Sequence, residues 1–353
     1  MSFDLQSAYH ALTYLAYHLT KAVTAFIQRD SFLYWPFALS ALLIAIAVAY
    51  AAHRARPAGS FASRLRASLS RELWWNASAR ADYRLYFANA LLLPVVFGMV
   101  LFSEKQVVRW LDAITGGATD VAAAADASIA SRVAFTIVFF LAYDFGRFVA
   151  HTLLHDVPLL WEFHKVHHSA ETLNPMTTFR AHPVDLAVMA WVPVLMTGLA
   201  TWTFNKLAAP VSLYTFLGLH VLVFAFNLIG ILRHSHVWLH YGPSWGKWLI
   251  SPAHHQLHHS REPEHAGGVN RGFELAVWDR LYGTLCVPGR KTEFRMGLGD
   301  GTDGQWHNVR RMYVLPFTLA EQRIGNTWRR LTGRAPAAPA ETFSADAPKQ
   351  PRG

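Results

Sequence analysis

Residues 133–155 read VAFTIVFFLAYDFGRFVAHTLLH, and this stretch joins the two features that decide the fold. Its first part, residues 133–149, is dominated by apolar residues and approaches the roughly 20 that a helix needs to cross a bilayer. It runs directly into His151 and His155, which are four residues apart and therefore share one helical face. The sequence thus predicts a membrane helix that ends by presenting two imidazoles on one side.

Three more histidine groups follow, so that 15 of the 19 histidines lie between His151 and His265. The groups are His164-Lys-Val-His167-His168, His236-Val-Trp-Leu-His240 and His255-Gln-Leu-His258-His259. Imidazole is the commonest side-chain ligand for metals. Four convergent groups supply more nitrogens than one ion needs, so we expect two metal ions.

The predicted ligands fall into a firm set and an open set. A lone histidine on an apolar helix is usually a packed core residue, and it is the recurrence in four groups that favours metal binding. The firm set comprises His151, His155, His164, His167, His168, His255, His258 and His259. The third group stays open, because His234, His236 and His240 are all candidates and at most two or three of them can bind.

The residue types exclude several familiar metal sites. Cys286 is the only cysteine, so neither a zinc ribbon nor an all-thiolate iron–sulfur site can be built. No HExxH motif occurs, which excludes a zinc protease of that type. Imidazole suits iron, zinc, copper and nickel. Two ions held by neutral nitrogens keep open positions that dioxygen or water can take.

Residues near the boxes are expected to support the ligands by accepting their second N–H group. Asp144 is the first candidate, because it lies seven residues before His151; the alternative is an ion pair with Arg147, three residues further on. His182 is also expected to support the site. The remaining carboxylate candidates are Glu162, Asp185, Glu262 and Asp279.

The composition indicates a membrane protein. Hydrophobic residues make up 52% of the chain and charged residues 16%, with a mean hydropathy of +0.17, which is more apolar than an ordinary soluble enzyme. The net charge is +9, and the basic residues flank apolar runs. This arrangement predicts anionic lipid headgroups of a bilayer as the partner, and no nucleic acid.

The predicted fold class is all-α, with about four to five membrane spans and a cytosolic helical cap that carries the histidine boxes. The spans are expected at 32–51, 86–102, 133–149, 184–204 and 211–232, and the last two form a hairpin. Residues 7–28 have amphipathic helical spacing, which predicts either an interfacial helix or one packed on the rest. The expected domains are an N-terminal membrane region (1–130), the histidine-box domain (131–290), a basic cytosolic segment (291–334) and a disordered tail (335–353).

The distribution of arginine and lysine sets the expected orientation. Residues 52–84 carry seven arginines and are expected on the cytoplasmic side, whereas the more acidic loop 103–131 is expected outside. Following the spans from there places all four boxes on the cytoplasmic side. The composition, rich in alanine and arginine, favours a bacterial inner membrane.

Together with the boxes, several short motifs resemble the fatty acid hydroxylase superfamily, also called the sterol desaturase family, of membrane-bound diiron oxygenases. The resemblance covers about residues 131–287. It rests on Asp144–His151, His164–Ser169, Arg180–Pro183, Arg233–His236, His255–Ser260, Asn270–Gly272 and Trp278–Thr284. The chain departs from the common bacterial pattern at His236 and His240, which complete a full HxxxH and leave the third group's ligands unsettled.

The resemblance implies two iron ions, dioxygen and electrons from a separate carrier of the ferredoxin or cytochrome b5 type. It implies hydroxylation or desaturation of an unactivated C–H bond in a fatty acyl or sterol-like lipid. It also places Asp144, His182, Asn270 and Asp279 among the catalytic residues. The alternative from another class is a membrane metal-binding or metal-transport protein that uses the histidines for zinc or iron.

Overall fold

The computed structural model describes residues 5–55, 60–116, 128–208, 211–265, 267–291 and 293–333. This part of the chain is mainly helical, with one antiparallel pair of short strands, β1 (Thr215–Phe216) and β2 (Leu219–His220). The predicted all-α class is therefore confirmed. The tail expected to be disordered, 335–353, lies outside the described residues.

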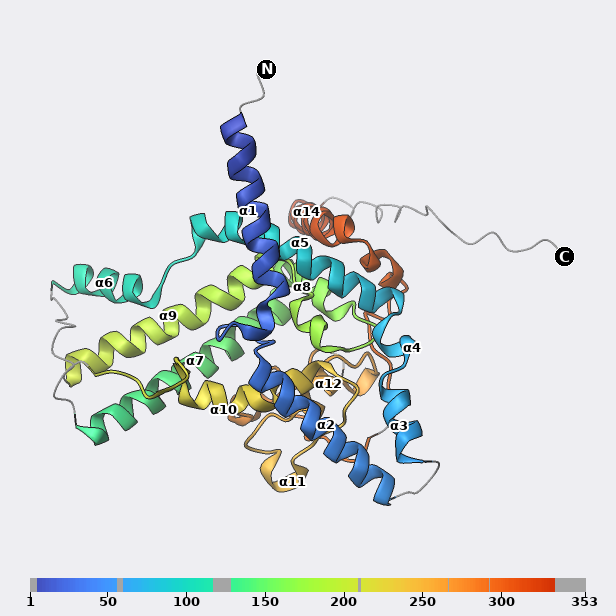
Figure 1. Cartoon of the computed structure of the whole chain (residues 1–353). Helices are drawn as coiled ribbons and strands as arrows, with labels where there is room; N and C mark the ends of the chain where they lie inside the picture. The colour runs from blue at the N-terminus through green and yellow to red at the C-terminus, as the bar shows by residue number, and fades with distance from the viewer. Residues whose placement is uncertain are drawn as a thin grey trace.

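Among the described residues, three helices are long and apolar enough to cross a membrane: α2 (Trp35–Ala55), α7 (Ile129–Asp156) and α9 (Pro183–Leu207). They coincide with three of the predicted spans. α7 and α9 run side by side in opposite directions (Figure 1). Their close approach depends on Gly146, because a Cβ atom there would lie 2.6 Å from the Cα of Pro193.

The stretch expected as a fifth span, 211–232, has a different form. The β1–β2 pair turns at Leu217 and Gly218, both with positive φ, before α10 (Val221–Gly230) begins. A helix of ten residues is about 15 Å long, half the roughly 30 Å of a hydrocarbon core. The hairpin with α9 therefore contains one full-length helix and one short one.

Three further long helices accompany the candidate membrane helices α2, α7 and α9. α5 (Ala77–Val100) contains most of the span expected at 86–102 and packs with the amphipathic helix α1 (Leu5–Val23). α6 (Glu104–Thr115) occupies the first part of the predicted outer loop. It begins at a capping box, in which the side chain of Ser103 accepts from an early backbone N–H, and it packs on α9.

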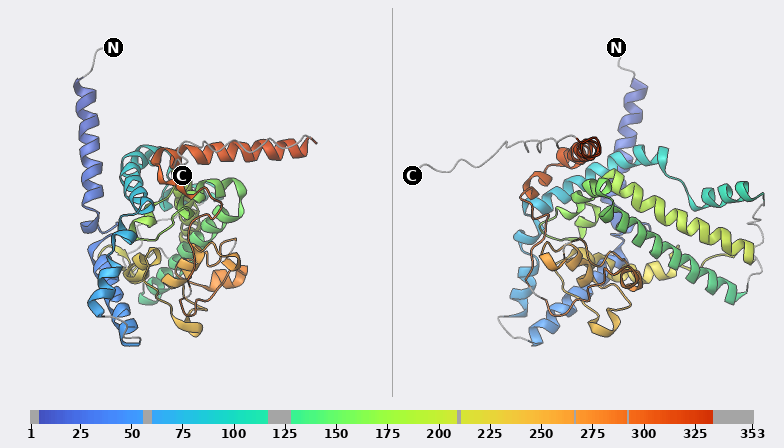
Figure 2. Two further views of the ribbon diagram at one scale, coloured as in Figure 1. Left: turned by 90° about the vertical axis from the view of Figure 1, so that its right-hand side faces the viewer. Right: turned by 180° about the vertical axis from the view of Figure 1, so that it is seen from behind.

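A cap of short helices gathers where α7 ends and α9 begins, while α1 and α14 extend away from this body in different directions (Figures 1 and 2). The short helices are α3 (Phe61–Ser68), α4 (Arg71–Trp74), α8 (Pro158–His168), η3 (Pro175–Phe179), η4 (Ile231–His234), α11 (Gly242–Trp245), α12 (Pro252–His258), η5 (Pro263–His265), α13 (Val277–Tyr282) and η6 (Asp303–His307), with the long α14 (Val309–Leu331) beside them. The segments that bear the histidine boxes therefore meet at one end of two candidate spans.

Two apolar clusters pack the short helices of the cap against the long helices. In the first, Phe37 and Ala41 of α2 pack against Ile231 and Leu232 of η4. In the second, Val166 of α8 packs against residues of α5, η6 and α14. Both α8 and η4 carry box histidines, so burial of these apolar side chains, worth roughly 25 cal/mol per Å², also positions imidazoles.

Candidate metal centre

Nine buried or nearly buried histidines converge into two groups. The first group contains His151 and His155 from α7, His164 and His168 from α8, and His258 from α12. The second contains His167 from α8, His234 from η4, His255 from α12, and His259 directly after α12. Within each group the candidate ligand atoms all lie within 4.8 Å of one another. All eight histidines of the firm predicted set, together with His234, are in these groups.

Two of the predicted third-group ligands, His236 and His240, lie outside both groups. Residues 237–240 are not helical, so the four-residue spacing does not put the two rings on one face. The Nδ1 atom of His240 accepts a hydrogen bond from the backbone N–H of Gly242. The third group therefore contributes His234 alone to the centre.

In five of the nine histidines, the ring nitrogen Nδ1 forms a hydrogen bond with a residue outside the two groups. His164 pairs through Nδ1 with the carboxylate of Asp185 at 2.8 Å. His151, His167 and His258 donate through Nδ1 to backbone carbonyls of Arg271 (2.7 Å), Arg180 (3.1 Å) and Val269 (2.8 Å). His234 exchanges a hydrogen bond with Thr178 Oγ1 at 3.0 Å. The carbonyl and carboxylate acceptors fix the tautomer of the first four rings, and in all five rings the contact is made by Nδ1, which leaves Nε2 for a metal.

The inner nitrogens fit a pair of cations. The Nε2 atoms of His164 and His168 are buried and have no hydrogen-bond partner among the described residues. His234 Nε2 lies 2.9 Å from that of His255 and 3.2 Å from those of His167 and His259. Two nitrogens bound at right angles to an ion at about 2.1 Å are about 3 Å apart. Metal ions would satisfy the lone pairs that face one another here, and the all-imidazole set suits iron as well as zinc or copper.

Burial also prepares the rings to bind a metal by keeping them neutral. Desolvation lowers the pKa of His167 to about 4, with further effects from neighbouring rings and charges. The same cause places the pKa values of His168, His234, His255, His258 and His259 well below their ordinary value. A metal ligand must be deprotonated, and these rings meet that condition at neutral pH.

The loop 269–272 orients two ligands of the first group, which come from different helices. Its carbonyls at Val269 and Arg271 accept from His258 and His151. Asp279 holds the loop by accepting the backbone N–H groups of Arg271 (2.7 Å) and Gly272 (2.8 Å). Asn270 has a positive φ of 55°, and its side chain bonds the backbone of Cys286 in both directions. Asp279 and Asn270 therefore act on the histidines through this loop.

Asp144 has a role that neither alternative from the sequence described. Its carboxylate accepts from the backbone N–H groups of Glu274 (3.0 Å) and Leu275 (3.1 Å) and from the indole of Trp278 (2.9 Å). Arg147 pairs with Glu274, not with Asp144. Asp144 thus anchors the continuation of the 269–272 loop to α7 and touches no box histidine directly.

His182 and two of the candidate acids lie away from the rings. His182 caps α9, with Nδ1 accepting from the N–H of Val184 and Nε2 bonding the carbonyl of Tyr313. Glu162 pairs with Lys165 and Arg323, and Glu262 pairs with Arg295. Of the predicted supporting acids, Asp185 is the one that contacts a box histidine.

A buried ion pair beneath the second group was not anticipated. Arg180 is completely buried and donates to Asp82 of α5 at 2.8 Å. The same side chain donates to Ser169 and to the carbonyl of Trp306, while the Arg180 carbonyl accepts from His167. Asp82 lies almost 100 residues before Arg180, in the arginine-rich stretch, and no local spacing signals this contact.

A cavity of about 410 Å³ reaches the centre from outside the cap. Four of the nine rings line it: His155, His168, His258 and His259. Gly268 forms part of the wall, and a Cβ atom there would lie 2.7 Å from Nδ1 of His155. The cavity therefore gives a small group of a substrate access to the edge of the histidine cluster.

Comparisons with known proteins agree with the motifs. The family model described as fatty acid hydroxylase matches residues 136–284. An ornithine lipid hydroxylase of Rhizobium tropici is 32% identical over 170 residues, which cover 47% of this chain and 46% of the relative. Alkylglycerol monooxygenases of Xenopus tropicalis and Homo sapiens are 29% and 27% identical over 148 and 156 residues, covering 41% and 44% of this chain and 29% and 31% of the relatives.

The matched region is limited in extent. The chain spans less than half the length of each of these relatives, and no solved structure matches it. Within that region, the predicted resemblance to the fatty acid hydroxylase superfamily is confirmed.

Proposed function

On the premise that residues 136–284 form a fatty acid hydroxylase domain, we propose that the protein is a membrane-bound lipid monooxygenase with two iron ions in its histidine centre. The observation that carries this proposal is the convergence of nine imidazoles at the shared end of α7 and α9. The first group would hold one ion and the second group the other. His236 and His240 have no part in this assignment.

The chain's own residues prepare the site in three ways. Burial keeps the rings neutral, Asp185 and the loop carbonyls aim Nε2 atoms inward, and the surrounding cap limits access of water. Iron, when bound, supplies the oxygen chemistry that an unactivated C–H bond requires. The protein supplies the position and the electrostatic surroundings of that chemistry.

The reaction we propose is hydroxylation. One C–H bond of the lipid breaks and one C–O bond forms with an atom of dioxygen; the other oxygen atom leaves as water, with two electrons and two protons. The electrons come from an external one-electron carrier of the ferredoxin or cytochrome b5 type. Hydroxylation is favoured over desaturation because the matched relatives are named hydroxylases and monooxygenases.

The substrate we propose is a membrane lipid with an acyl or alkyl chain. The centre lies at the end of two candidate spans, and the relatives' names specify an ornithine lipid and alkylglycerols. We place the centre at the cytoplasmic face of a bacterial inner membrane. Support for this orientation comes from α3 and α4 of the arginine-rich stretch, which lie on the same side of the molecule as the histidine-bearing helices α8 and α12 (Figure 1).

The direct test uses the full-length protein, purified in detergent and supplied with ferrous iron. We expect about two irons per chain and, with a reductant and a mixed lipid extract, incorporation of one atom of ¹⁸O from ¹⁸O₂ into a lipid product. Iron-loaded protein that consumes no oxygen and labels no lipid would contradict the proposal. Net flux of zinc or iron through vesicles that contain the protein would instead support the transport alternative.

A further inference from the structure

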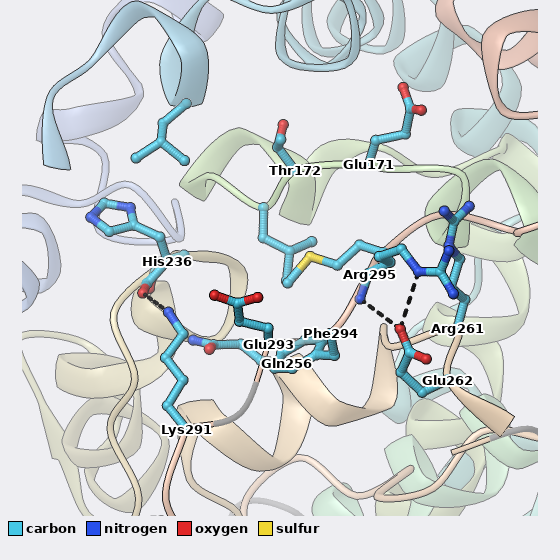
Figure 3. Close-up of a pocket in the computed structure, with 14 residues that line it drawn as sticks. Glu171, Thr172, His236, Gln256, Arg261, Glu262, Lys291, Glu293, Phe294 and Arg295 are labelled. Atoms are coloured by element: carbon cyan, nitrogen blue, oxygen red, sulfur yellow. Dashed lines mark hydrogen bonds and ion pairs between the residues drawn. The ribbon is translucent and has the colours of Figure 1, made fainter. Parts of the chain in front are cut away.

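A second, larger cavity of about 1110 Å³ is drawn in Figure 3. Ser235 and Gln256 line it, and they directly follow His234 and His255 in the chain. Ligand pockets usually measure roughly 300–1,000 Å³, so this cavity has room for a polar headgroup and the start of a chain. None of the nine clustered imidazoles lines it.

Charged side chains of both signs line this cavity in equal number. They are Arg261, Lys291, Arg295, Glu171, Glu262 and Glu293. Figure 3 shows Glu293 between Lys291 on one side and the group of Arg261, Glu262 and Arg295 on the other. Such a balanced lining favours neither a purely anionic nor a purely cationic ligand.

Two of these six side chains, Lys291 and Glu293, form no ion pair with an acidic, basic or histidine side chain among the described residues. Glu262 pairs with Arg295 at 3.4 Å, and Glu171 and Arg261 pair with groups outside the set at 2.9 and 3.6 Å. Lys291 donates to the backbone carbonyl of His236, which carries no charge, at 3.2 Å. Glu293 forms no hydrogen bond or ion pair in the described part of the chain. One cation and one carboxylate are thus free to meet a ligand that carries both signs.

Arg261 connects this cavity to the smaller one that reaches the rings, because it lines both. Its backbone N–H donates to the carbonyl of Arg295 at 3.0 Å, and Gly299 packs under its side chain. The wall between the cavities is therefore held in place. A ligand seated in the larger cavity has its nearest route to the histidine centre past this one side chain.

The larger cavity also has an apolar part that suits a lipid. Leu73 of α4, Leu173, Phe294 and Met296 contribute to its lining. α4 belongs to the arginine-rich stretch, and basic segments of this kind lie against anionic membrane surfaces. The polar end of a lipid could therefore enter the cavity while its chains remain at the bilayer.

We propose that the larger cavity binds the zwitterionic headgroup of the lipid substrate, with a primary ammonium group at Glu293 and an anionic group at Lys291. Bound in this way, the lipid directs a carbon in or next to its headgroup past Arg261 to the histidine-lined cavity. This inference rests on the proposed function. At that carbon the C–H bond is replaced by C–OH, with dioxygen as oxidant and the external carrier's two electrons reducing the second oxygen atom to water.

Binding is tested first, without iron, so that it does not depend on turnover. Dioleoyl phosphatidylethanolamine is compared with dioleoylglycerol and dioleoyl phosphatidylglycerol, each presented to the full-length protein in detergent and measured by native mass spectrometry. The test variants are Lys291→Gln, Glu293→Gln and the double variant. The matched controls are Lys247→Gln and Glu321→Gln, which remove exposed charges away from the cavity.

We expect phosphatidylethanolamine to bind more tightly than the other two lipids. The double variant should lose roughly five- to tenfold of that preference, as expected for two partly solvated charge contacts, and the controls should keep it. Equal binding of all three lipids by the native protein would overturn the proposal. Equal binding of soluble glycerophosphoethanolamine would overturn the assignment to a lipid.

The position of oxidation is tested with iron and reductant, by tandem mass spectrometry of the product. We expect the new oxygen in the headgroup or on the carbons next to it, whereas oxygen in the middle of an acyl chain would overturn the proposal. Oxidation of all lipids alike would leave the monooxygenase standing and remove the headgroup site. Selective binding with no oxidation of any lipid would keep the headgroup site and remove the monooxygenase.

Discussion

The histidine groups at 255–259 and 236–240 have related spacings and opposite outcomes. In the first, α12 carries His255 and His258, and His259 follows at once, so all three rings enter the centre. In the second, the chain leaves η4 before residue 236 and is not helical, so neither ring reaches it. A spacing of three or four residues is therefore informative only where the backbone is helical.

The largest loss of iron and of activity is expected when a proposed metal ligand is replaced. Replacing His258 with Ala removes an imidazole that faces four other rings of the first group, so iron content should fall by about half or more. Activity should fall by more than about 100-fold, beyond the 10- to 100-fold typical of outer partners. Metal analysis and ¹⁸O incorporation measure the two effects, and membrane insertion serves as the control for folding. Full activity in this variant would remove His258 from the ligand set.

A smaller loss of iron is expected for a residue that contacts a ligand and not the metal itself. Asp185→Asn replaces the carboxylate that pairs with His164 Nδ1, so the ring is held less firmly and is a weaker base. Iron affinity should fall by roughly 10- to 100-fold, measured by competition with a chelator. Asp112→Asn is the matched control, because it breaks an ion pair with Lys206 far from the centre. Equal affinities in the two variants would show that the contact between Asp185 and His164 does not support the metal, and that Asp185 serves only as an acidic residue in the first turn of α9.

Asp144 is further from the metal, because it holds the continuation of the loop that supports the ligands. Its replacement therefore tests an indirect effect. Asp144→Asn weakens the acceptor of two backbone N–H groups and one indole. Leaving such buried donors poorly satisfied costs about 1–3 kcal/mol, so the midpoint of unfolding should fall clearly. Iron affinity should fall by less than in Asp185→Asn, since the loop carbonyls shift only indirectly. A larger loss of iron than in Asp185→Asn would show that Asp144 controls the ligands more directly.

These graded effects reflect what the sequence could predict. The long apolar runs predicted α2, α7 and α9, because a membrane span depends on local composition. The i, i+3 and i+4 spacing predicted the eight firm histidines, because α7, α8 and α12 are helical there. Both kinds of signal are local: the structure contains these three helices and brings the eight histidines together.

The remaining features depend on contacts between distant segments. The carbonyls of Val269 and Arg271 support ligands through backbone atoms, which no residue type encodes. Asp82 meets Arg180 across almost 100 residues, and the arginines nearest to Asp82 in the sequence, Arg80 and Arg84, are half-buried and exposed. The turn at Leu217 and Gly218 interrupts an apolar run that composition alone describes as continuous. Each of these requires knowledge of which segments pack together.

The smallest effect is expected at His240, in the histidine group that does not reach the centre. His240→Ala removes a ring whose one described hydrogen bond is with the backbone N–H of Gly242, so iron content and activity should stay within about twofold of the native protein. Metal analysis beside His258→Ala makes the comparison direct. If His240→Ala lost an iron, His240 would have to be a ligand although residues 237–240 are not helical, and the proposed difference between the two histidine groups would be wrong.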